Sequence, residues 1–254
     1  MDDLTAGWLA DLERRHLADL TPSEVARALR ALSSCYVERR AKLADGEALG
    51  SRGKRAAFAL FYGPLHFLVT REIVRAIPES QAELRSIVDL GCGTGAAGIA
   101  WAIGAHVPRI LGFDRSAWAA DEATRGYRAF HLDGHAVRRD LAAAVAGRGP
   151  QPFRAQPGTG LVAAYLVNEL DEVARQAMLQ HLLTARSAGS RILVIEPIAR
   201  RTAPWWADWS AAFGRLGGRA DEWRFQVPLP PTQQRLARAA GLDPRELTAR
   251  SLFA

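Results

Sequence analysis

The chain has 254 residues, of which 48% are hydrophobic, and a formal net charge of +6 at pH 7. This length fits one α/β domain with an added helical segment. Its two cysteines, Cys35 and Cys92, exclude a disulfide framework and a four-cysteine metal site, so no metal is expected. No apolar run approaches the roughly 20 residues of a membrane span, and Met1-Asp-Asp lacks the pattern of a secretory signal, which favours a cytoplasmic protein without membrane contact.

Residues 1–80 are predicted to be helical and to form a lid and substrate-binding segment. Thr21-Pro-Ser-Glu24 supplies a cap, an early proline and an acidic first turn, and apolar residues follow at helical spacing. The polar stretch 44–54 contains glycines and predicts a mobile loop. A second helix is expected at 55–77, where Gly63-Pro64 should kink or split it.

Residues 81–254 alternate between strand and helix patterns, apart from a Gly/Pro/Gln-rich loop at 147–160. The β-type runs are 86–90, 109–113, 135–138, 161–167 and 191–195. Strands interleaved with helices imply a parallel sheet covered on both faces. Near the C-terminus, Trp223-Arg-Phe-Gln-Val and 246–253 predict two more strands around a helix that begins near Pro231. The expected fold class is a Rossmann-like α/β sheet, mostly parallel, with one antiparallel strand near the C-terminus.

A glycine-rich loop, Asp89-Leu-Gly-Cys-Gly-Thr-Gly95, joins the first predicted strand to an alanine-rich helix. Gly91, Cys92 and Gly93 would let a ligand approach the backbone closely at the start of this helix. The same spacing also fits a dinucleotide site. Asp89 favours a cationic ligand, because a carboxylate there would repel a pyrophosphate, and S-adenosylmethionine (SAM) carries an ammonium and a sulfonium. A tight turn without a ligand is the alternative.

Carboxylates also follow the second and third predicted strands. Asp114 is placed to accept the hydroxyls of a cofactor ribose, or to cap the helix from Ser116. Asp140 is placed to accept the adenine amino group, or to cap a helix. Arg115 and Leu141, beside them, are predicted walls of the adenine pocket.

The fourth predicted strand ends in Tyr165-Leu-Val-Asn-Glu-Leu170, at the sheet edge where open α/β sheets bind ligands. Asn168 is predicted to contact the cofactor and to orient the substrate, and Glu169 to act as a general base if the acceptor must lose a proton. The alternative is that Asn168 and Glu169 cap the following helix.

Other residues are predicted to lie on the substrate side of this edge. Glu196-Pro197 ends the fifth strand, and Trp206 belongs to a tryptophan-rich segment that either lines the substrate site or anchors the core. Tyr62 and His66 come from the kinked N-terminal helix and would close over the cofactor or pack in the core. The predicted substrate contacts are Tyr62, His66, Tyr165, Glu196 and Trp206.

Together these features resemble class I SAM-dependent methyltransferases, whose sheets end in such a strand pair. Over residues 55–254 the chain resembles, more narrowly, the methyltransferase-like family associated with the mitochondrial ribosomal small subunit and its bacterial relatives. The matching segments are Val88–Gly95, Ala164-Tyr-Leu-Val-Asn-Glu-Leu170, Ile192-Leu-Val-Ile-Glu-Pro197, Asp221-Glu-Trp-Arg-Phe with Pro228-Leu-Pro, and Ser251-Leu-Phe. This chain has Ile198 where that family typically has glycine. It also lacks the family's cluster-binding cysteines, so no iron–sulfur cluster is expected.

The resemblance implies a SAM-dependent methyltransferase domain at residues 81–254 that acts on RNA, protein or a small molecule. The net charge of +6 comes almost entirely from arginine and is dispersed along the chain, which predicts at most a moderate basic surface for contact with RNA or a ribosome. A non-catalytic SAM- or RNA-binding ribosome assembly factor is the alternative, and an NAD-dependent oxidoreductase is a third reading that Asp89 and the final strand pair disfavour.

Overall fold

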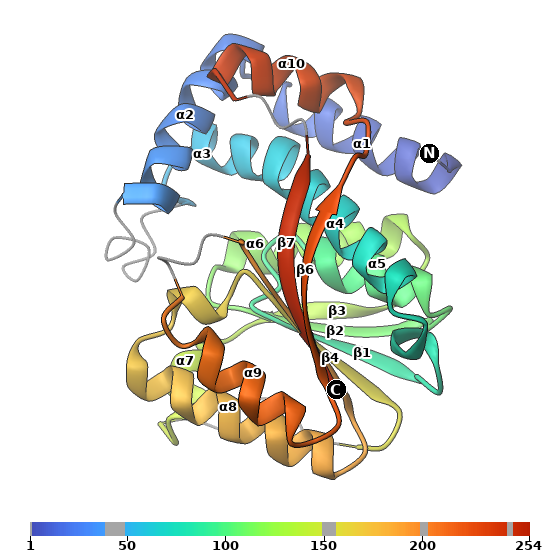
Figure 1. Cartoon of the computed structure of the whole chain (residues 1–254). Coiled ribbons are helices and arrows are strands. Elements are labelled where there is room, and N and C mark those ends of the chain that lie inside the picture. The colour runs from blue at the N-terminus through green and yellow to red at the C-terminus, as the bar shows by residue number, and fades with distance from the viewer. Residues whose placement is uncertain (1, 39–48, 149–155, 199–202, 243–245) are drawn as a thin grey trace.

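The computed structural model describes residues 2–38, 49–148, 156–198, 203–242 and 246–254 (Figure 1). The predicted loop at 44–54 therefore falls partly outside the described residues, as does the centre of the loop at 147–160. Within the described residues, no helix is long and apolar enough to cross a membrane.

A seven-stranded sheet with the order β3-β2-β1-β4-β5-β7-β6 forms the centre of the molecule. The first five strands are parallel, and β7 runs antiparallel to both of its neighbours. The strands are β1 (Ser86–Leu90), β2 (Arg109–Asp114), β3 (Asp133–Arg138), β4 (Thr159–Ala164), β5 (Arg191–Glu196), β6 (Arg219–Phe225) and β7 (Leu247–Phe253). The predicted mostly parallel sheet with an antiparallel strand near the C-terminus is confirmed.

Side chains on alternate strand positions enter two separate hydrophobic clusters, because successive residues of a strand point to opposite faces. Ile87 of β1 belongs to one cluster and Val88 to the other; Leu193 and Val194 of β5 divide in the same way. Helices between the strands add residues to these clusters: α5 (Ala96–Gly104), α6 (Ala117–Ala129), α7 (Leu141–Val145), α8 (Glu172–Ser187) and α9 (Trp206–Gly214). Both faces of the parallel sheet are therefore covered.

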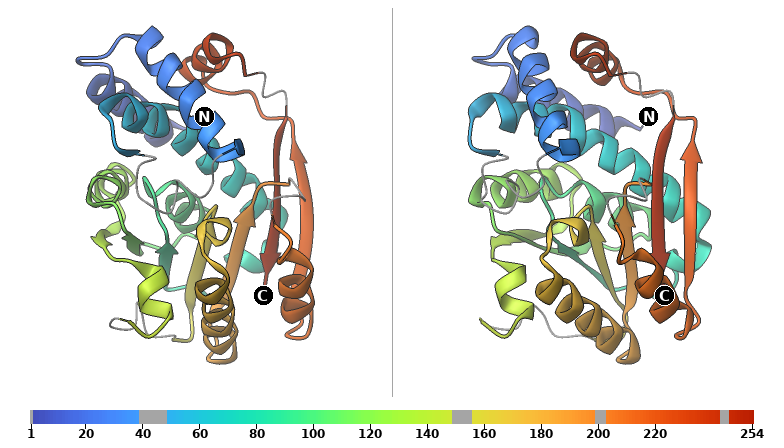
Figure 2. Two further views of the ribbon diagram at one scale, coloured as in Figure 1. Left: turned by 90° about the vertical axis from the view of Figure 1, so that its left-hand side faces the viewer. Right: turned by 60° about the vertical axis from the view of Figure 1, so that its left-hand side comes forward.

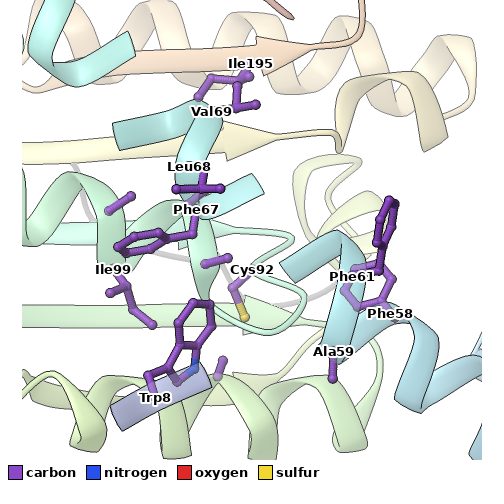
Figure 3. Packing of buried hydrophobic residues seen from close by; sticks show 14 of the residues in the cluster. Trp8, Phe58, Ala59, Phe61, Phe67, Leu68, Val69, Cys92, Ile99 and Ile195 are labelled. Carbon is purple, nitrogen blue, oxygen red and sulfur yellow. The ribbon is translucent and has the colours of Figure 1, made fainter. Parts of the chain in front are cut away.

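A helical layer lies against one end of the sheet and contains both N-terminal and C-terminal helices (Figures 1 and 2). Its members are α1 (Asp3–His16), α2 (Pro22–Glu38), α3 (Arg52–Ala57), a π-helical turn (Phe58–Tyr62), α4 (Gly63–Ala76) with the short 3-10 turn Pro78–Gln81, and α10 (Pro231–Ala240). Figure 3 shows Trp8 of α1, Phe67 of α4 and Ile99 of α5 converging in the core. Thr21 and Glu24 form the predicted reciprocal cap of α2.

The helix around Gly63-Pro64 neither stops nor splits; it changes to a π-helical turn just before the proline. The Gly63 N–H donates to the Phe58 carbonyl, five residues earlier. Pro64 has no N–H for the Leu60 carbonyl, and that carbonyl instead accepts a hydrogen bond from the Gln233 side-chain amide of α10 at 2.7 Å. A π-helical turn thus takes the place of the predicted kink, and a side chain of α10 bonds to the carbonyl that the proline leaves without a donor. Such turns are common at functional sites.

The predicted end of the fourth strand is wrong by three residues. β4 ends at Ala164, because Tyr165 has a positive φ of 59° and turns the chain out of the sheet. Val167–Glu169 then forms a 3-10 turn, and Asp171, rather than Asn168 or Glu169, caps α8 by accepting a hydrogen bond from the Ala174 N–H at 2.8 Å.

Candidate functional site

The glycine loop takes backbone conformations that only glycine adopts easily. Gly91, Gly93 and Gly95 have φ values of 66°, 52° and 80°, and Gly95 begins α5. A Cβ at Gly91 would lie 2.7 Å from a methyl carbon of Leu166, just beyond β4. The loop therefore brings its bare backbone against the end of β4.

Asp89 is a buried carboxylate beneath this loop. Its Oδ2 accepts a hydrogen bond from the Gly98 N–H of α5 at 3.0 Å. Burial raises the pKa of Asp89 to about 7, and the negative charge of Asp114 adds to the rise. When Asp89 is ionised, its charge is therefore buried and lies near the charge of a second carboxylate.

Asp114, at the end of β2, bonds to the glycine loop from the other side. One of its oxygens accepts a hydrogen bond from the Gly93 N–H at 2.9 Å, and the other accepts one from the Ser116 N–H at 2.8 Å. Burial is the main cause of its raised pKa. The residue that caps α6 is Ser116 and not Asp114. Each Asp114 oxygen keeps a second lone pair for a ligand.

Three other residues predicted for the cofactor side are Cys92, Asp140 and Leu141. Burial raises the pKa of the Cys92 thiol well above its usual value, so Cys92 is neutral. Asp140 is exposed and caps α7 by accepting a hydrogen bond from the Ala143 N–H at 3.0 Å, so its capping alternative is observed. Leu141 is buried.

Arg115 is exposed at the end of β2, and its carbonyl accepts a hydrogen bond from the Arg138 guanidinium at 3.2 Å. Two arginines from neighbouring strand ends therefore lie together at this edge of the sheet.

Asn168 is the centre of a hydrogen-bond network that joins the ends of β4 and β5. Its backbone N–H and side-chain amide donate to Glu196 at 3.2 and 2.5 Å, and its side-chain oxygen accepts a hydrogen bond from the Trp205 indole at 3.0 Å. Glu196 is fully buried, and burial raises its pKa to about 8. The Asn168 side chain is thus held by protein groups, and Glu169 beside it is exposed.

The tryptophans after β5 divide between the core and this network. Trp209 is completely buried, and Trp205 packs against it with ring centroids 4.9 Å apart. Trp206 is half-buried under the buried Arg250 of β7, whose guanidinium carbon lies 4.1 Å from the ring centroid. The core alternative therefore describes Trp205 and Trp209, while Trp206 lies against a cation.

His66 and Tyr165 meet at the end of β4, although they are far apart in the sequence. Their rings are stacked, with centroids 3.8 Å apart and planes 16° from parallel. Tyr62 lies beside them, 6.0 Å from His66 between centroids, and its hydroxyl hydrogen-bonds Ser33 of α2. Burial lowers the pKa of His66 to about 3, so the imidazole is neutral.

The helical layer contacts the glycine loop directly. A Cβ at Gly93 would lie 3.4 Å from the ring of Phe58, and one at Gly63 would lie 2.8 Å from the Thr94 hydroxyl. Gly63 therefore lets the start of α4 rest on the loop.

The sequence reasoning gave no site role to Phe58 or Arg250. Phe58 belonged to a run of aromatics without a distinguishing signal, and Arg250 lies in a buried strand, where a charged residue is itself such a signal. Within the described residues, no group of three or more His, Cys, Asp or Glu side chains is arranged to hold a metal ion.

No protein-family model and no curated protein sequence matches the chain, but many solved structures share its architecture. The methyltransferase domain of bacterial CtHen1 is 14% identical, with a TM-score of 0.50, over 75% of this chain and 98% of that one. A SAM-dependent methyltransferase from Aquifex aeolicus is 11% identical, with a TM-score of 0.45, over 71% and 88% of the two chains. Precorrin 8w decarboxylase from Methanobacterium thermoautotrophicum is 14% identical, with a TM-score of 0.46, over 74% and 89%.

The chain has the Rossmann-like class I methyltransferase fold. This likeness concerns the fold, and the chemistry rests on the residues at the carboxyl ends of the strands.

Proposed function

We propose that the protein is a SAM-dependent methyltransferase with the cofactor held between the glycine loop and Asp114. The observation that carries this proposal is the pair of carboxylates beside the glycine loop, buried Asp89 and half-buried Asp114, whose raised pKa values mark a site poor in compensating positive charge. A cationic ligand would stabilise their ionised forms. A pyrophosphate would be repelled by Asp89.

The glycine loop and its surroundings fit such a ligand. Gly91 and Gly93 take the positive-φ conformations that form the tight turn of the loop, and Asp114 has lone pairs for ribose hydroxyls. Asp140 and Leu141 follow β3 at the same edge of the sheet, where the proposal places the adenine ring. Arg115, next to Asp114, is assigned to the same pocket. When bound, SAM supplies an electrophilic methyl group.

The remaining residues have distinct roles in this proposal. Tyr62, His66 and Tyr165 form the acceptor side above the loop. Asn168 and Glu196 fix the ends of β4 and β5 relative to each other, so that the reacting groups are positioned rather than activated.

The acceptor belongs, in this proposal, to a cytoplasmic RNA or ribosomal particle. Arg115 and Arg138 at the β2 and β3 ends would meet its phosphates, in keeping with the narrower resemblance to the ribosome-associated family. Protein and small-molecule acceptors remain the other outcomes of the labelling experiment below.

One observation favours a second candidate, a non-catalytic SAM- or RNA-binding assembly factor. The pair predicted to be catalytic offers little chemistry, because the Asn168 side chain is bonded to Glu196 and Trp205 and Glu169 is exposed. This candidate requires SAM binding without methyl transfer.

Thermal shift measurements with SAM and NAD test the proposal first, since a ligand that binds only the folded state raises its melting temperature. A rise with SAM and none with NAD is expected; a rise with NAD alone would refute the cofactor assignment. Methyl-labelled SAM is then incubated with fractionated RNA, protein and metabolite pools. Label in the RNA pool supports the proposal, and SAM binding with no label in any pool supports the assembly factor.

A further inference from the structure

His66 is the one described imidazole held by aromatic rings at the carboxyl edge of the sheet. Tyr165 stacks on it at 3.8 Å, the ring of Phe58 meets it edge-on at 6.2 Å, and Tyr62 lies 6.0 Å away. Rings packed in this way fix the plane of the imidazole without using its nitrogens.

The neighbours of His66 place it over the glycine loop. Phe58 lies against Gly93. Leu166, which follows Tyr165 in the chain, lies against Gly91. One ring neighbour of His66, and the residue next to another, therefore pack against the first two glycines of the loop.

The backbone at Tyr165 is strained in a way that serves this arrangement. A φ of 59° is uncommon for a bulky side chain, and such conformations persist mainly at functional sites, where the surrounding structure enforces them. Here the Tyr165 N–H donates to the Ile195 carbonyl of β5 at 2.8 Å. The strained turn directs the Tyr165 ring to His66.

The ring nitrogens of His66 have no hydrogen-bond partner within the described part of the chain, and the residue is half-buried. A neutral imidazole has one N–H donor and one nitrogen lone pair. Since burial keeps His66 neutral, its lone pair is available to a group that carries a proton.

We propose that His66 contacts the methyl acceptor and takes its proton, and that the acceptor is therefore an uncharged O–H or N–H group. This inference rests on the proposed methyltransferase function. The acceptor's lone pair forms the new bond to the methyl carbon, and the electron pair of the broken S–C bond stays on sulfur, which leaves as a neutral thioether. The acceptor's proton goes to the free nitrogen of His66 and then to solvent.

A weakly basic imidazole suffices for this step, because an oxygen or nitrogen becomes far more acidic as its bond to the methyl carbon forms. A carboxylate acceptor carries no proton and would need no such group. His66 therefore acts on acceptors that carry a proton, because its ring N–H can donate to any acceptor but only its nitrogen lone pair can take a proton.

The test compares the full-length protein with His66→Gln, which keeps a polar group but accepts no proton, and with His66→Ala. His135→Gln, an exposed histidine of β3, is the matched control. Label transfer from methyl-labelled SAM to the RNA, protein and metabolite pools should fall by roughly 100-fold in both His66 variants, while the thermal shift with SAM stays as in the wild type. Added imidazole should restore transfer to His66→Ala; pyrrole, which has the same shape but no basic nitrogen, should not.

Two further measurements do not depend on turnover rate. In the NMR spectrum of the SAM-free protein, His66 should remain neutral at about pH 5, where an ordinary histidine is protonated. The label in the product should be stable to base, as in an ether or N-methyl group, whereas a methyl ester would release methanol. Wild-type transfer rates in His66→Gln, or a base-labile label, would overturn this inference alone. A wild-type protein without SAM binding would overturn the proposed function as well.

Discussion

The buried carboxylate of Asp89 gives the SAM-free protein a characteristic dependence on pH. In the unfolded chain this group titrates near 3.8, and in the folded protein near 7. The folded state therefore holds a proton that the unfolded state has lost, and stability falls as the pH rises from about 4 to 7. A shift of about three pKa units corresponds to about 4 kcal/mol in all.

Asp89→Asn removes this titration while keeping an oxygen for the Gly98 N–H. Between about pH 5.5 and about pH 8.5, the wild type should lose about 2 kcal/mol of unfolding free energy relative to Asp89→Asn, because nearly half of the total is already lost at the lower pH. For a chain of this length that is roughly 4–8 °C in melting temperature. Glu196 titrates in the same direction in both proteins and cancels in the difference.

Circular dichroism melts across this pH range, with exposed Asp133→Asn as the control, measure the effect. A cationic ligand favours the ionised form of Asp89, so the apparent affinity for SAM should rise with pH by up to about 30-fold in the wild type, following the ionised fraction. It should change little in Asp89→Asn. Parallel pH profiles for the wild type and Asp89→Asn would refute the reasoning.

Three further substitutions test the packing around the site. Gly63→Ala should lower the unfolding free energy by roughly 1–3 kcal/mol, because its Cβ would lie 2.8 Å from the Thr94 hydroxyl. In urea titrations, the double variant Gly63→Ala/Thr94→Ala should recover most of this loss. If the effects of the two substitutions on the unfolding free energy simply added, the contact would be contradicted. Asn168→Ala removes the side-chain amide that bonds to buried Glu196 and Trp205, while the backbone N–H of residue 168 still donates to Glu196. It should cost about 2–4 kcal/mol in the same assay, and a change below about 0.5 kcal/mol would count against the network. Glu122→Ala removes the carboxylate that Arg15 and His16 of α1 contact, while Arg15 keeps its bond to Asp11, and should cost about 1–3 kcal/mol. Hydrogen–deuterium exchange of residues 3–16 should quicken, and unchanged protection would argue against this anchor.

The strands of the parallel sheet were predictable because their signals are local. β1 has the predicted bounds, and β2 and β5 are each longer by one residue, since short β-branched runs between turn residues mark buried strands. The end of β4 was not predictable, because Tyr165 has a conformation that its residue type disfavours and that Ile195 and His66 enforce.

The candidate site was predictable to a different degree on its two sides. Asp89, Asp114 and the glycine loop lie at the ends of strands that local sequence signals predict, so their proximity follows from the topology of a parallel sheet. The partners of Asn168 cannot be predicted in this way. Trp205 lies 37 residues away and reaches Asn168 only after β5 has paired, and no spacing rule connects them.

The contact between Gln233 and Leu60 has a consequence for the order in which the chain acquires its structure during synthesis. Segments that leave the ribosome first generally fold first, yet the N-terminal helices receive this bond, and one from the Thr232 hydroxyl to Glu13, from a helix that follows them by 173 and 219 residues in the chain. The layer above the glycine loop is thus completed only after α10 has been made. A nascent chain halted before α10 would lack the bonds that Thr232 and Gln233 make to Glu13 and Leu60.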